Sequence, residues 1–453
     1  MFHIENQSVR DLLLAGNFGL EKESLRVLAD GSFSHSPHPF ENDEHIVKDF
    51  CENQTEINTG VHKSAREAVS ELEFHTRRIY KTLNALSPRE YLWQFSNPPH
   101  IKDENDIPIA VFNGERSSKS EYRGYLSDKY GRYKMTFSGI HVNYSFADEL
   151  LKADYEFCRK DEQSADFSSS RQTTQSDSQD SLSFRDYKDR VYLDLARGLA
   201  ASGWILTAAT AASPVMDASY LEKDVYGRDA FTGMGSVRCG ESGYWNEFAP
   251  IFDYSSIESY AESIRRYVKK GMLRAPSELY YPVRLKPAGE NNLNSLVRGG
   301  INRVELRMFD LNPLVFSCVE ERDILFAQLL IVWVASSPPR PFSESDQVNA
   351  IHNFKNAAHY DLKTVRMITP DGANTSIADA AIMMINEMKS FFADVSEKAQ
   401  SVLDFELEKF TDAENRYAWK IRREFGSDFA RKALALAKER QELAAQNEGN
   451  QNV

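Results

Sequence analysis

Hydrophobic positions recur with helical spacing in several long segments of the chain. Residues 64–86 place apolar side chains three and four positions apart, and Ser64 stands where a helix cap is preferred. Residues 185–212 begin with mixed charged and apolar positions and then become almost wholly apolar, which predicts a helix that enters a buried core. Residues 379–410 and 414–446 carry dense charge at helical spacing, which predicts surface helices.

Other segments alternate between apolar and polar residues, which is the spacing of half-buried β-strands. In one of them Arg303, Glu305 and Arg307 form the polar set between apolar neighbours. In another, His141 and Asn143 share the polar face. These strands therefore present mainly ionisable side chains on the face turned away from the core.

Two acidic stretches fit the same alternating pattern. If residues 50–56 form a strand, every second side chain from Glu52 to Glu56 lines one face. Glu21 and Glu23, within GLEKESLRV, share a face in the same way if that segment is extended. We therefore expect extended structure in both stretches.

A charged strand face taken alone is commonly a solvated one, with ion pairs that contribute less than ~1 kcal/mol each. If the strands join one sheet with these faces on the same side, however, several carboxylates crowd together, and cations are needed to offset their repulsion. The acidic residues concerned are Glu21, Glu23, Asp49, Glu56 and Glu305. Carboxylates with one imidazole suit Mg²⁺ or Mn²⁺, and magnesium among carboxylates most often serves phosphate chemistry.

The nucleotide and zinc motifs GxxxxGK[ST], GxGxxG before a helix, and HExxH are absent. From the residues alone, the interpretation stops at a metal-dependent enzyme on an antiparallel sheet, with a nucleoside triphosphate as one option for its substrate.

Composition narrows the class of protein and of partner. The 453 residues are 42% apolar and 27% charged, and 67 acidic against 54 basic residues give a net charge of −13. This balance argues against non-specific binding to nucleic acid or to an anionic membrane. The four cysteines show no CxxC spacing. Because the longest apolar run, residues 324–335, is short and no basic-then-apolar start is present, we expect a cytoplasmic protein and a buried helix there.

One segment differs in composition from the rest. Eight of the 21 residues in 163–183 are Ser, and such a segment buries too little apolar surface to offset its ordering entropy. We expect a mobile insertion there, within a single domain over residues 1–446 that ends in a helical part over 379–446. The polar residues 447–453 are expected to be a disordered tail.

Nine sequence blocks lie in one order along most of residues 18–315. They are GLEKESLRV at 19–27, DFCENQTE at 49–56, YRGYLSDKYG at 122–131, SGIHVNYS at 138–145, GWI at 203–205, ASP at 212–214, R-x5-Y at 238–244, ELYYPVR at 278–284 and RGGINRVELRMFDLNP at 298–313. In these blocks the chain resembles the bacterial glutamate–cysteine ligases (γ-glutamylcysteine synthetases). It is similar both to the single-function enzymes and to the amino-terminal half of the bifunctional glutathione synthetases.

The resemblance implies an α+β fold related to glutamine synthetase, in which a curved antiparallel sheet forms an active-site funnel surrounded by helices. It also implies an ATP-dependent ligase that phosphorylates the γ-carboxylate of L-glutamate and then joins it to the amine of L-cysteine, the first step of glutathione synthesis. Mg²⁺ or Mn²⁺ is the implied cofactor. The implied partners are these small molecules, and the protein is expected to be a monomer or a small homo-oligomer.

The resemblance also assigns roles to individual positions. Those that match the family's metal ligands are Glu21, Glu23, Asp49, Glu56, His141 and Glu305. Arg307 matches an arginine that stabilises charge on the transferring phosphoryl group, so Arg307 and Glu305 are the implied catalytic residues. Arg123 and Arg238 match ligands of substrate carboxylates, a task that suits a planar guanidinium.

The implied acceptor pocket is the part in which this sequence departs from the family. The positions that match it are Phe50, Tyr122, Leu126, Met135, Tyr244 and Tyr280. Gln is expected where Met135 stands, an aromatic residue where Val142 stands and Gly where Ala211 stands. Loss of an amide from the pocket favours a more apolar acceptor, or removes a hydrogen bond to the acceptor.

Three functions therefore remain open at this point. The first is glutamate–cysteine ligation, and the second is γ-glutamylation of a different, more apolar amino acid. The third is a non-catalytic homologue or partner subunit. The chain retains a matching residue at every metal position of the family, which argues against this third function. The length leads us to expect no second nucleotide-binding domain after residue 446.

Overall fold

The computed structural model describes residues 1–114, 117–168, 183–222, 225 and 227–451, with the backbone alone for 161–168 and 447–451. A seven-stranded antiparallel sheet forms its centre, in the order β2-β3-β1-β5-β9-β8, with β4 paired to the end of β1. The strands of this sheet are β1 (Gly16–Val27), β2 (Ile46–Lys48), β3 (Gln54–Asn58), β4 (Tyr91–Trp93), β5 (Gly139–Phe146), β8 (Val283–Pro287) and β9 (Ile301–Asp310). Two short ribbons, β6 (Met216–Asp217) with β7 (Asp229–Ala230) and β10 (Arg366–Ile368) with β11 (Asn374–Ser376), lie outside it.

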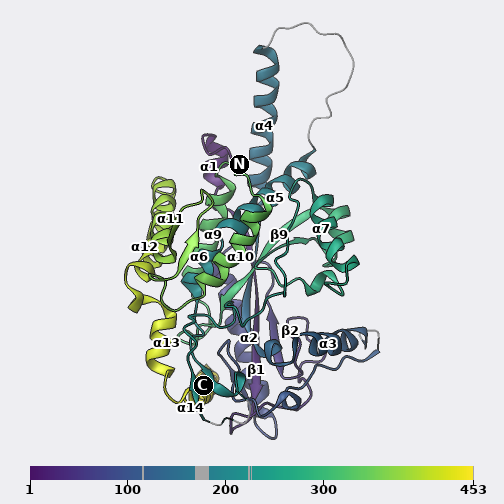
Figure 1. Cartoon of the computed structure of the whole chain (residues 1–453), viewed down its shortest axis with the longest axis vertical. Coiled ribbons are helices and arrows are strands. Elements are labelled where there is room, and N and C mark those ends of the chain that lie inside the picture. The colour runs from purple at the N-terminus through teal and green to yellow at the C-terminus, as the bar shows by residue number, and fades with distance from the viewer. Residues whose placement is uncertain (115–116, 169–182, 223–224, 226, 452–453) are drawn as a thin grey trace.

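Helices cover one face of the sheet (Figure 1). α2, α5 and α6 pack directly on the sheet, and α9 packs on these three helices. The helices are α1 (Gln7–Leu12), α2 (Ala65–Ala85), α3 (Ser117–Tyr130), α4 (Asp148–Ser168), α5 (Phe184–Ser202), α6 (Trp204–Thr210), α7 (Ile257–Lys269), α8 (Leu293–Gly299), α9 (Glu321–Ala335), α10 (Glu344–Ala357), α11 (Ile377–Phe391), α12 (Glu397–Thr411), α13 (Tyr417–Phe425) and α14 (Phe429–Gln451).

The core lies between the sheet and this helical layer. Leu20, Val142 and Leu306, on three neighbouring strands, are fully buried in one cluster with residues of the covering helices. Because side chains alternate along a strand, the residues between them point to the opposite face. The helices thus bury the apolar side of the sheet and leave the ionisable side for the site described below.

Several predicted elements are confirmed. The helix expected over 64–86 is α2, and the Ser64 side chain caps it by accepting a hydrogen bond from the backbone of Glu67. The apolar run 324–335 lies in the buried helix α9. The expected α+β fold, with an antiparallel sheet surrounded by helices, is also confirmed. No described helix combines the length and apolar character that crossing a bilayer requires.

Other boundaries differ from the prediction. Residues 50–56 are not one strand, because Glu52 and Asn53 form a turn between an isolated bridge at Cys51 and the start of β3 at Gln54. Glu52 therefore leaves the face that Glu56 occupies, and it pairs with Lys48 at 3.0 Å instead. The expected helices 379–410 and 414–446 are each divided in two, into α11 with α12 and α13 with α14.

The segments expected to lack order are described only in part. Residues 163–168 are the end of α4, which extends away from the body of the molecule (Figure 1). Of the rest of the Ser-rich segment 163–183, residues 169–182 lie outside the described residues and Ser183 caps α5. At the other end, α14 continues past residue 446 to Gln451, and residues 452–453 are not described.

Candidate active site

Three potential metal ligands from three adjacent strands converge on the face of the sheet opposite the helices. Glu21 of β1, His141 of β5 and Glu305 of β9 each offer a ligand atom, and these atoms lie within 4.8 Å of one another. His141 Nδ1 is 2.8 Å from Glu21 Oε2 and 3.7 Å from Glu305 Oε1. Asn143 donates to Glu21 Oε1 at 2.9 Å, which fixes that carboxylate. The alternating pattern thus brings together side chains that are far apart in the sequence.

A β-bulge sets the position of Arg307 in this cluster. Between Val142 and Ile140 the register of β5 against β9 shifts, so that His141 lies opposite both Arg307 and Met308. The shift leaves Arg307 Nη1 3.4 Å from His141 Nδ1. Bulges are frequent next to active sites, where they re-aim a side chain, and this one places a guanidinium beside the imidazole.

Glu305 is the carboxylate of the cluster whose ionised form its surroundings favour most. Its side chain is 1% exposed, yet Arg307 Nη1 donates to its Oε1 at 2.9 Å and Lys286 Nζ lies 3.1 Å from its Oε2. Burial by itself raises the pKa of Glu305, but the charges of Arg307, Lys286 and Arg284 hold it well below its usual range. This carboxylate is therefore ionised at neutral pH.

In the neighbouring carboxylates Glu23 and Glu56, burial and nearby negative charges disfavour the ionised form. Glu23 of β1 stands directly opposite Glu56 of β3, and it accepts a hydrogen bond from the backbone of Gly139 at 3.0 Å. Burial raises the pKa of Glu23. Burial, followed by the charges of Asp49, Glu21 and Glu23, raises the pKa of Glu56 well above its usual range. The folded chain thus holds acidic groups whose ionisation it disfavours.

This donor set fits divalent cations. Oxygen ligands predominate, and carboxylates raised in pKa by one another are neutralised most directly by a bound cation. Among the described residues, the buried atom His141 Nε2 has no hydrogen-bond partner, and Glu305 Oε2 has no partner besides its ion pair with Lys286. His141 Nε2 also lies 3.8 Å from Glu23 Oε1, so both ring nitrogens face carboxylates.

Two arginines border the acidic groups. Arg123 of α3 donates through Nε to the backbone oxygen of Asp49 at 2.6 Å and through Nη2 to its carboxylate at 3.2 Å. Arg238 is buried against Gly139 and donates to the backbone oxygen of Phe309 at 3.2 Å. Both guanidinium groups keep further N–H donors with which a carboxylate of a substrate could pair.

The residues expected to form the acceptor pocket lie in one apolar cluster beside these arginines. Its members among the expected residues are Phe50, Tyr122, Leu126, Met135, Tyr244 and Tyr280. The rings of Tyr244 and Tyr280 meet edge to face at 4.5 Å, and the hydroxyl of Tyr244 contacts the Met135 sulfur at 3.1 Å. Tyr244 and Tyr280 also line a small cavity with Arg238 and Arg307, which joins the apolar cluster to the charged one.

Val142 has a different place from the one its position next to His141 suggests. It is 1% exposed and belongs to the core between sheet and helices, on the face opposite the pocket. The replacement of an aromatic residue by Val142 therefore does not alter the lining of the acceptor pocket. Met135, by contrast, is both a buried core residue and a neighbour of the pocket tyrosines.

Lys286 is a site residue that the sequence analysis missed. It sits on β8, where the alternation in VRLKP places Arg284 and Lys286 on the same face as Glu305 of the adjacent strand. The period-two pattern of this segment could have revealed it. Only the pairing of β8 with β9, however, brings its ammonium group to Glu305.

The sheet with its helical cover defines a fold shared with two solved ligases. The bifunctional glutathione synthetase from Pasteurella multocida matches with a TM-score of 0.80 and 23% identity, over 97% of this chain and 54% of its own. The glutamate–cysteine ligase from Francisella tularensis in complex with AMP matches with a TM-score of 0.79 and 19% identity, over 95% of this chain and 89% of its own. The family model described as glutamate-cysteine ligase matches residues 1–272 and 249–357. The chain belongs to the glutamate–cysteine ligase family, which confirms the resemblance found in the sequence.

Curated relatives agree with this assignment. The glutathione biosynthesis bifunctional protein GshAB of Listeria welshimeri is 31% identical over 432 residues, which cover 92% of this chain and 53% of the relative. The protein of the same name from Clostridium perfringens is 30% identical over 434 residues, with the same two shares. The chain thus spans about half the length of the curated relatives it matches.

Proposed function

We propose that this chain is an ATP- and Mg²⁺-dependent ligase that joins the γ-carboxylate of L-glutamate to the amine of L-cysteine, in the first step of glutathione synthesis. The observation that carries the proposal is the convergence of Glu21, His141 and Glu305 from three strands, next to Arg307 and a pocket lined by tyrosines. Family membership and the AMP bound to the Francisella tularensis ligase support an adenine nucleotide as co-substrate.

The proposed reaction has two steps. An oxygen of the glutamate γ-carboxylate attacks the terminal phosphorus of ATP, and ADP leaves. The acceptor amine then attacks the carbon of the acyl phosphate, and phosphate leaves as the amine loses a proton. Each step needs a separate set of protein groups, one for the phosphoryl oxygens and one for the two amino acids.

The acidic groups are assigned to divalent cations. The residues that would hold them are Glu21, Glu23, Asp49, Glu56, His141 and Glu305. Mg²⁺, or Mn²⁺ in its place, would supply charge neutralisation for phosphate oxygens. Glu305 keeps its negative charge at neutral pH because Arg307 and Lys286 flank it, so it remains a ligand under assay conditions.

The arginines are assigned to the reacting anions. Arg307 presents a fixed guanidinium whose pKa is raised by the charge of Glu305, despite the opposing effect of burial, so it stays protonated throughout turnover. Such a preorganised charge stabilises the phosphoryl group as it transfers. Arg123 and Arg238 would bind substrate carboxylates, since a planar guanidinium pairs with a carboxylate through two parallel hydrogen bonds.

The apolar pocket favours a second candidate acceptor. Phe50, Leu126 and Met135 supply no amide, and the Met135 sulfur already contacts the hydroxyl of Tyr244. A small amino acid more apolar than cysteine would fit the same pocket without leaving a polar group unpaired. Both candidates use the same phosphoryl chemistry and differ only in the amine. We further propose a cytoplasmic protein that acts on small molecules as a monomer or small homo-oligomer.

A phosphate-release assay tests the proposal. The chain is supplied with ATP, Mg²⁺ and glutamate, and a panel of amines is compared. Phosphate release that requires cysteine supports the first candidate, and strong turnover with another amine beside little with cysteine supports the second. Absence of amine-dependent release across the panel would overturn the assignment as a ligase and favour a non-catalytic role.

A further inference from the structure

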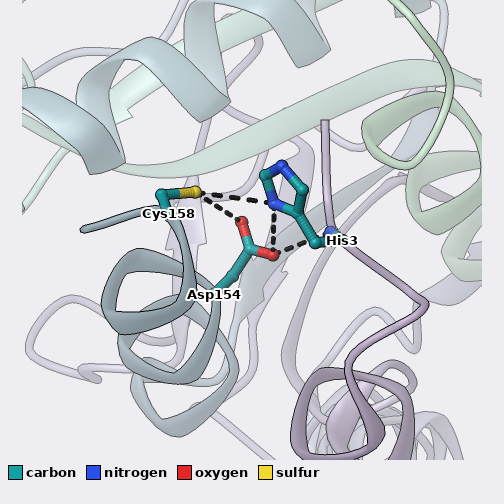
Figure 2. A group of neighbouring side chains, drawn as sticks. All are labelled: His3, Asp154 and Cys158. Atoms are coloured by element: carbon teal, nitrogen blue, oxygen red, sulfur yellow. Dashed lines mark hydrogen bonds and ion pairs between the residues drawn. The ribbon is translucent and has the colours of Figure 1, made fainter. Parts of the chain in front are cut away.

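A second group of metal-ligand side chains joins the start of the chain to α4, the helix that extends from the body of the molecule (Figure 1). His3 precedes α1, and Asp154 and Cys158 stand one turn apart on the same face of α4. Figure 2 shows the three side chains pointing toward one another. His3 Nδ1 is 3.1 Å from Asp154 Oδ1 and 3.5 Å from Cys158 Sγ, and Sγ is 4.0 Å from Asp154 Oδ2.

The geometry does not fit a nucleophilic relay. In such a relay the imidazole uses one ring nitrogen for the nucleophile and the other for the orienting carboxylate. Here the thiol and the carboxylate both face the same nitrogen of His3, as Figure 2 shows. One imidazole nitrogen cannot donate to Asp154 and accept from Cys158 at the same time. The three potential ligand groups therefore lie close together, and hydrogen bonds through the one nitrogen cannot satisfy both the carboxylate and the thiol.

The spacing of the donors fits a tetrahedral metal ion instead. Zn²⁺ binds thiolate at ~2.3 Å and imidazole at ~2.0–2.1 Å, so a tetrahedral angle separates these two ligand atoms by about 3.5 Å. The sulfur–nitrogen distance in the cluster is 3.5 Å, and the nitrogen–oxygen distance of 3.1 Å is close to the ~3.3 Å of the same geometry. The distance from Cys158 Sγ to Asp154 Oδ2 is 4.0 Å, somewhat longer than the ~3.5 Å of the same geometry, and the carboxylate oxygen near His3 is the other one, Oδ1.

We propose that His3, Asp154 and Cys158 supply three ligands of a binding site for Zn²⁺. The thiolate makes the site selective, because sulfur ligands favour zinc whereas Mg²⁺ prefers oxygen ligands only. This site is therefore distinct in chemistry from the carboxylate cluster on the sheet. It does not rest on the proposed ligase function.

The surroundings hold the donors in place. Tyr187 of α5 donates its hydroxyl to Asp154 Oδ2 at 2.5 Å, and the backbone N–H of His3 donates to Oδ1 at 2.8 Å. The carboxylate side chain is 1% exposed, and the His3 ring packs against Phe157 at 5.2 Å. Such outer partners orient a ligand and strengthen metal binding. A bound ion would link the segment before α1 to α4, beside the contact of α4 with α5.

Cobalt substitution tests the site in the full-length chain. Metal-depleted protein is titrated with Co²⁺ in excess Mg²⁺, which keeps the sheet cluster occupied. We expect Co²⁺ bound at this site to give tetrahedral ligand-field bands and a thiolate charge-transfer band, and Zn²⁺ to displace it. Cys158→Ser should lose the charge-transfer band, and Tyr187→Phe should weaken Zn²⁺ binding by about 10- to 100-fold. A wild-type chain without a thiolate band, or an unchanged band in Cys158→Ser, would overturn the proposal.

A matched control and a second readout keep the test independent of variant folding. His35 pairs with Asp106 at the same distance of 3.1 Å but is not part of any metal-ligand group among the described residues, so His35→Gln should bind Co²⁺ as the wild type does. In the unaltered chain, Zn²⁺ should slow alkylation of Cys158 by iodoacetamide by about 10-fold or more, as peptide mass analysis measures. An alkylation rate that Zn²⁺ leaves unchanged would also contradict the site.

Discussion

Glu23 on β1 and Glu56 on β3 stand directly opposite each other in the antiparallel register, on a face where Glu21 and Asp49 add further negative charge. Opposed like charges destabilise a sheet by up to ~1 kcal/mol per pair. The folded chain therefore carries a local electrostatic cost in the part of the sheet that we assign to cation binding. A divalent cation bound between the carboxylates would turn this destabilising interaction into a stabilising one.

The first prediction follows from this pair. Without divalent cations, Glu56→Gln should raise the free energy of unfolding by about 1 kcal/mol, because the repulsion is lost. Mg²⁺ should stabilise the wild type and stabilise the variant less. Thermal unfolding with and without Mg²⁺ measures both effects, with Glu44→Gln as a control at an exposed acidic position of the same region. A destabilised variant with a full Mg²⁺ response would contradict the assignment.

The second prediction concerns Glu305 and Arg307. Glu305→Gln keeps the shape of the side chain and removes the charge, so we expect amine-dependent phosphate release to be lost while the fold survives. Arg307→Ala should lower kcat by roughly 10²- to 10³-fold, the usual cost of a preorganised transition-state contact. The exposed Arg298 offers a matched control, since Arg298→Ala should leave kcat unchanged. Wild-type rates in Glu305→Gln, with unaltered circular dichroism, would refute the catalytic role.

The third prediction uses the contact between Gly139 and Arg238. A Cβ at position 139 would overlap the guanidinium of Arg238, which must then move. Displacement of a substrate-positioning group by about 1 Å can cost roughly 10²-fold, so Gly139→Ala should lower kcat/KM for glutamate by about that factor. Gly19→Ala is the control on the neighbouring strand, because the nearest atom to its new Cβ is 3.6 Å away. Equal kinetics for the two variants would show that Arg238 does not position glutamate.

The sequence predicted the ionisable faces of β1, β5 and β9 because alternation along a strand is a local property. It did not predict the bulge opposite His141, which depends on how β5 and β9 pair. Lys286 was missed for the same reason, since its partner Glu305 belongs to another strand. Register between distant strands is decided by packing and pairing rather than by the local pattern.

The helices show where local patterns stop being informative. The apolar run in α9 was predicted because a buried helix is apolar on all sides. The break between α11 and α12, near Phe392, was not predicted, because dense surface charge gives similar periodicity on both sides of it. The group of His3 with Asp154 and Cys158 joins residues about 150 positions apart, and only the folded chain brings them together.

The fourth prediction addresses the acceptor. Met135→Gln places an amide where the sulfur contacts Tyr244, so the pocket gains polar groups that favour a polar acceptor. The ratio of kcat/KM for cysteine to that for an apolar amino acid should rise by about 10-fold, within the 1–3 kcal/mol that such pockets discriminate. KM for ATP and glutamate should stay unchanged. Measurement of both acceptors in the same assay tests this, and a ratio that does not move would show that Met135 does not set specificity.

The last prediction concerns stability away from the site. Asp323, Glu406 and Lys409 form a buried charged group in which Lys409 Nζ lies 2.7 Å from Asp323 and 2.9 Å from Glu406, and the hydroxyl of Tyr417 donates to Asp323. All three charged side chains are at most 2% exposed. One cation therefore faces two carboxylates, and burial raises the pKa of Glu406 to about 8.

Because this pKa is higher in the folded chain than in the unfolded chain, folding favours the protonated form of Glu406. Its contribution to stability is complete below the unfolded value near 4.5 and is lost as the pH rises through about 8. The free energy of unfolding, measured by urea titration, should therefore fall between these pH values. Glu406→Gln should flatten that fall, whereas Glu408→Gln, at an exposed position of the same helix, should preserve it. An unchanged pH dependence in Glu406→Gln would place the titrating group elsewhere.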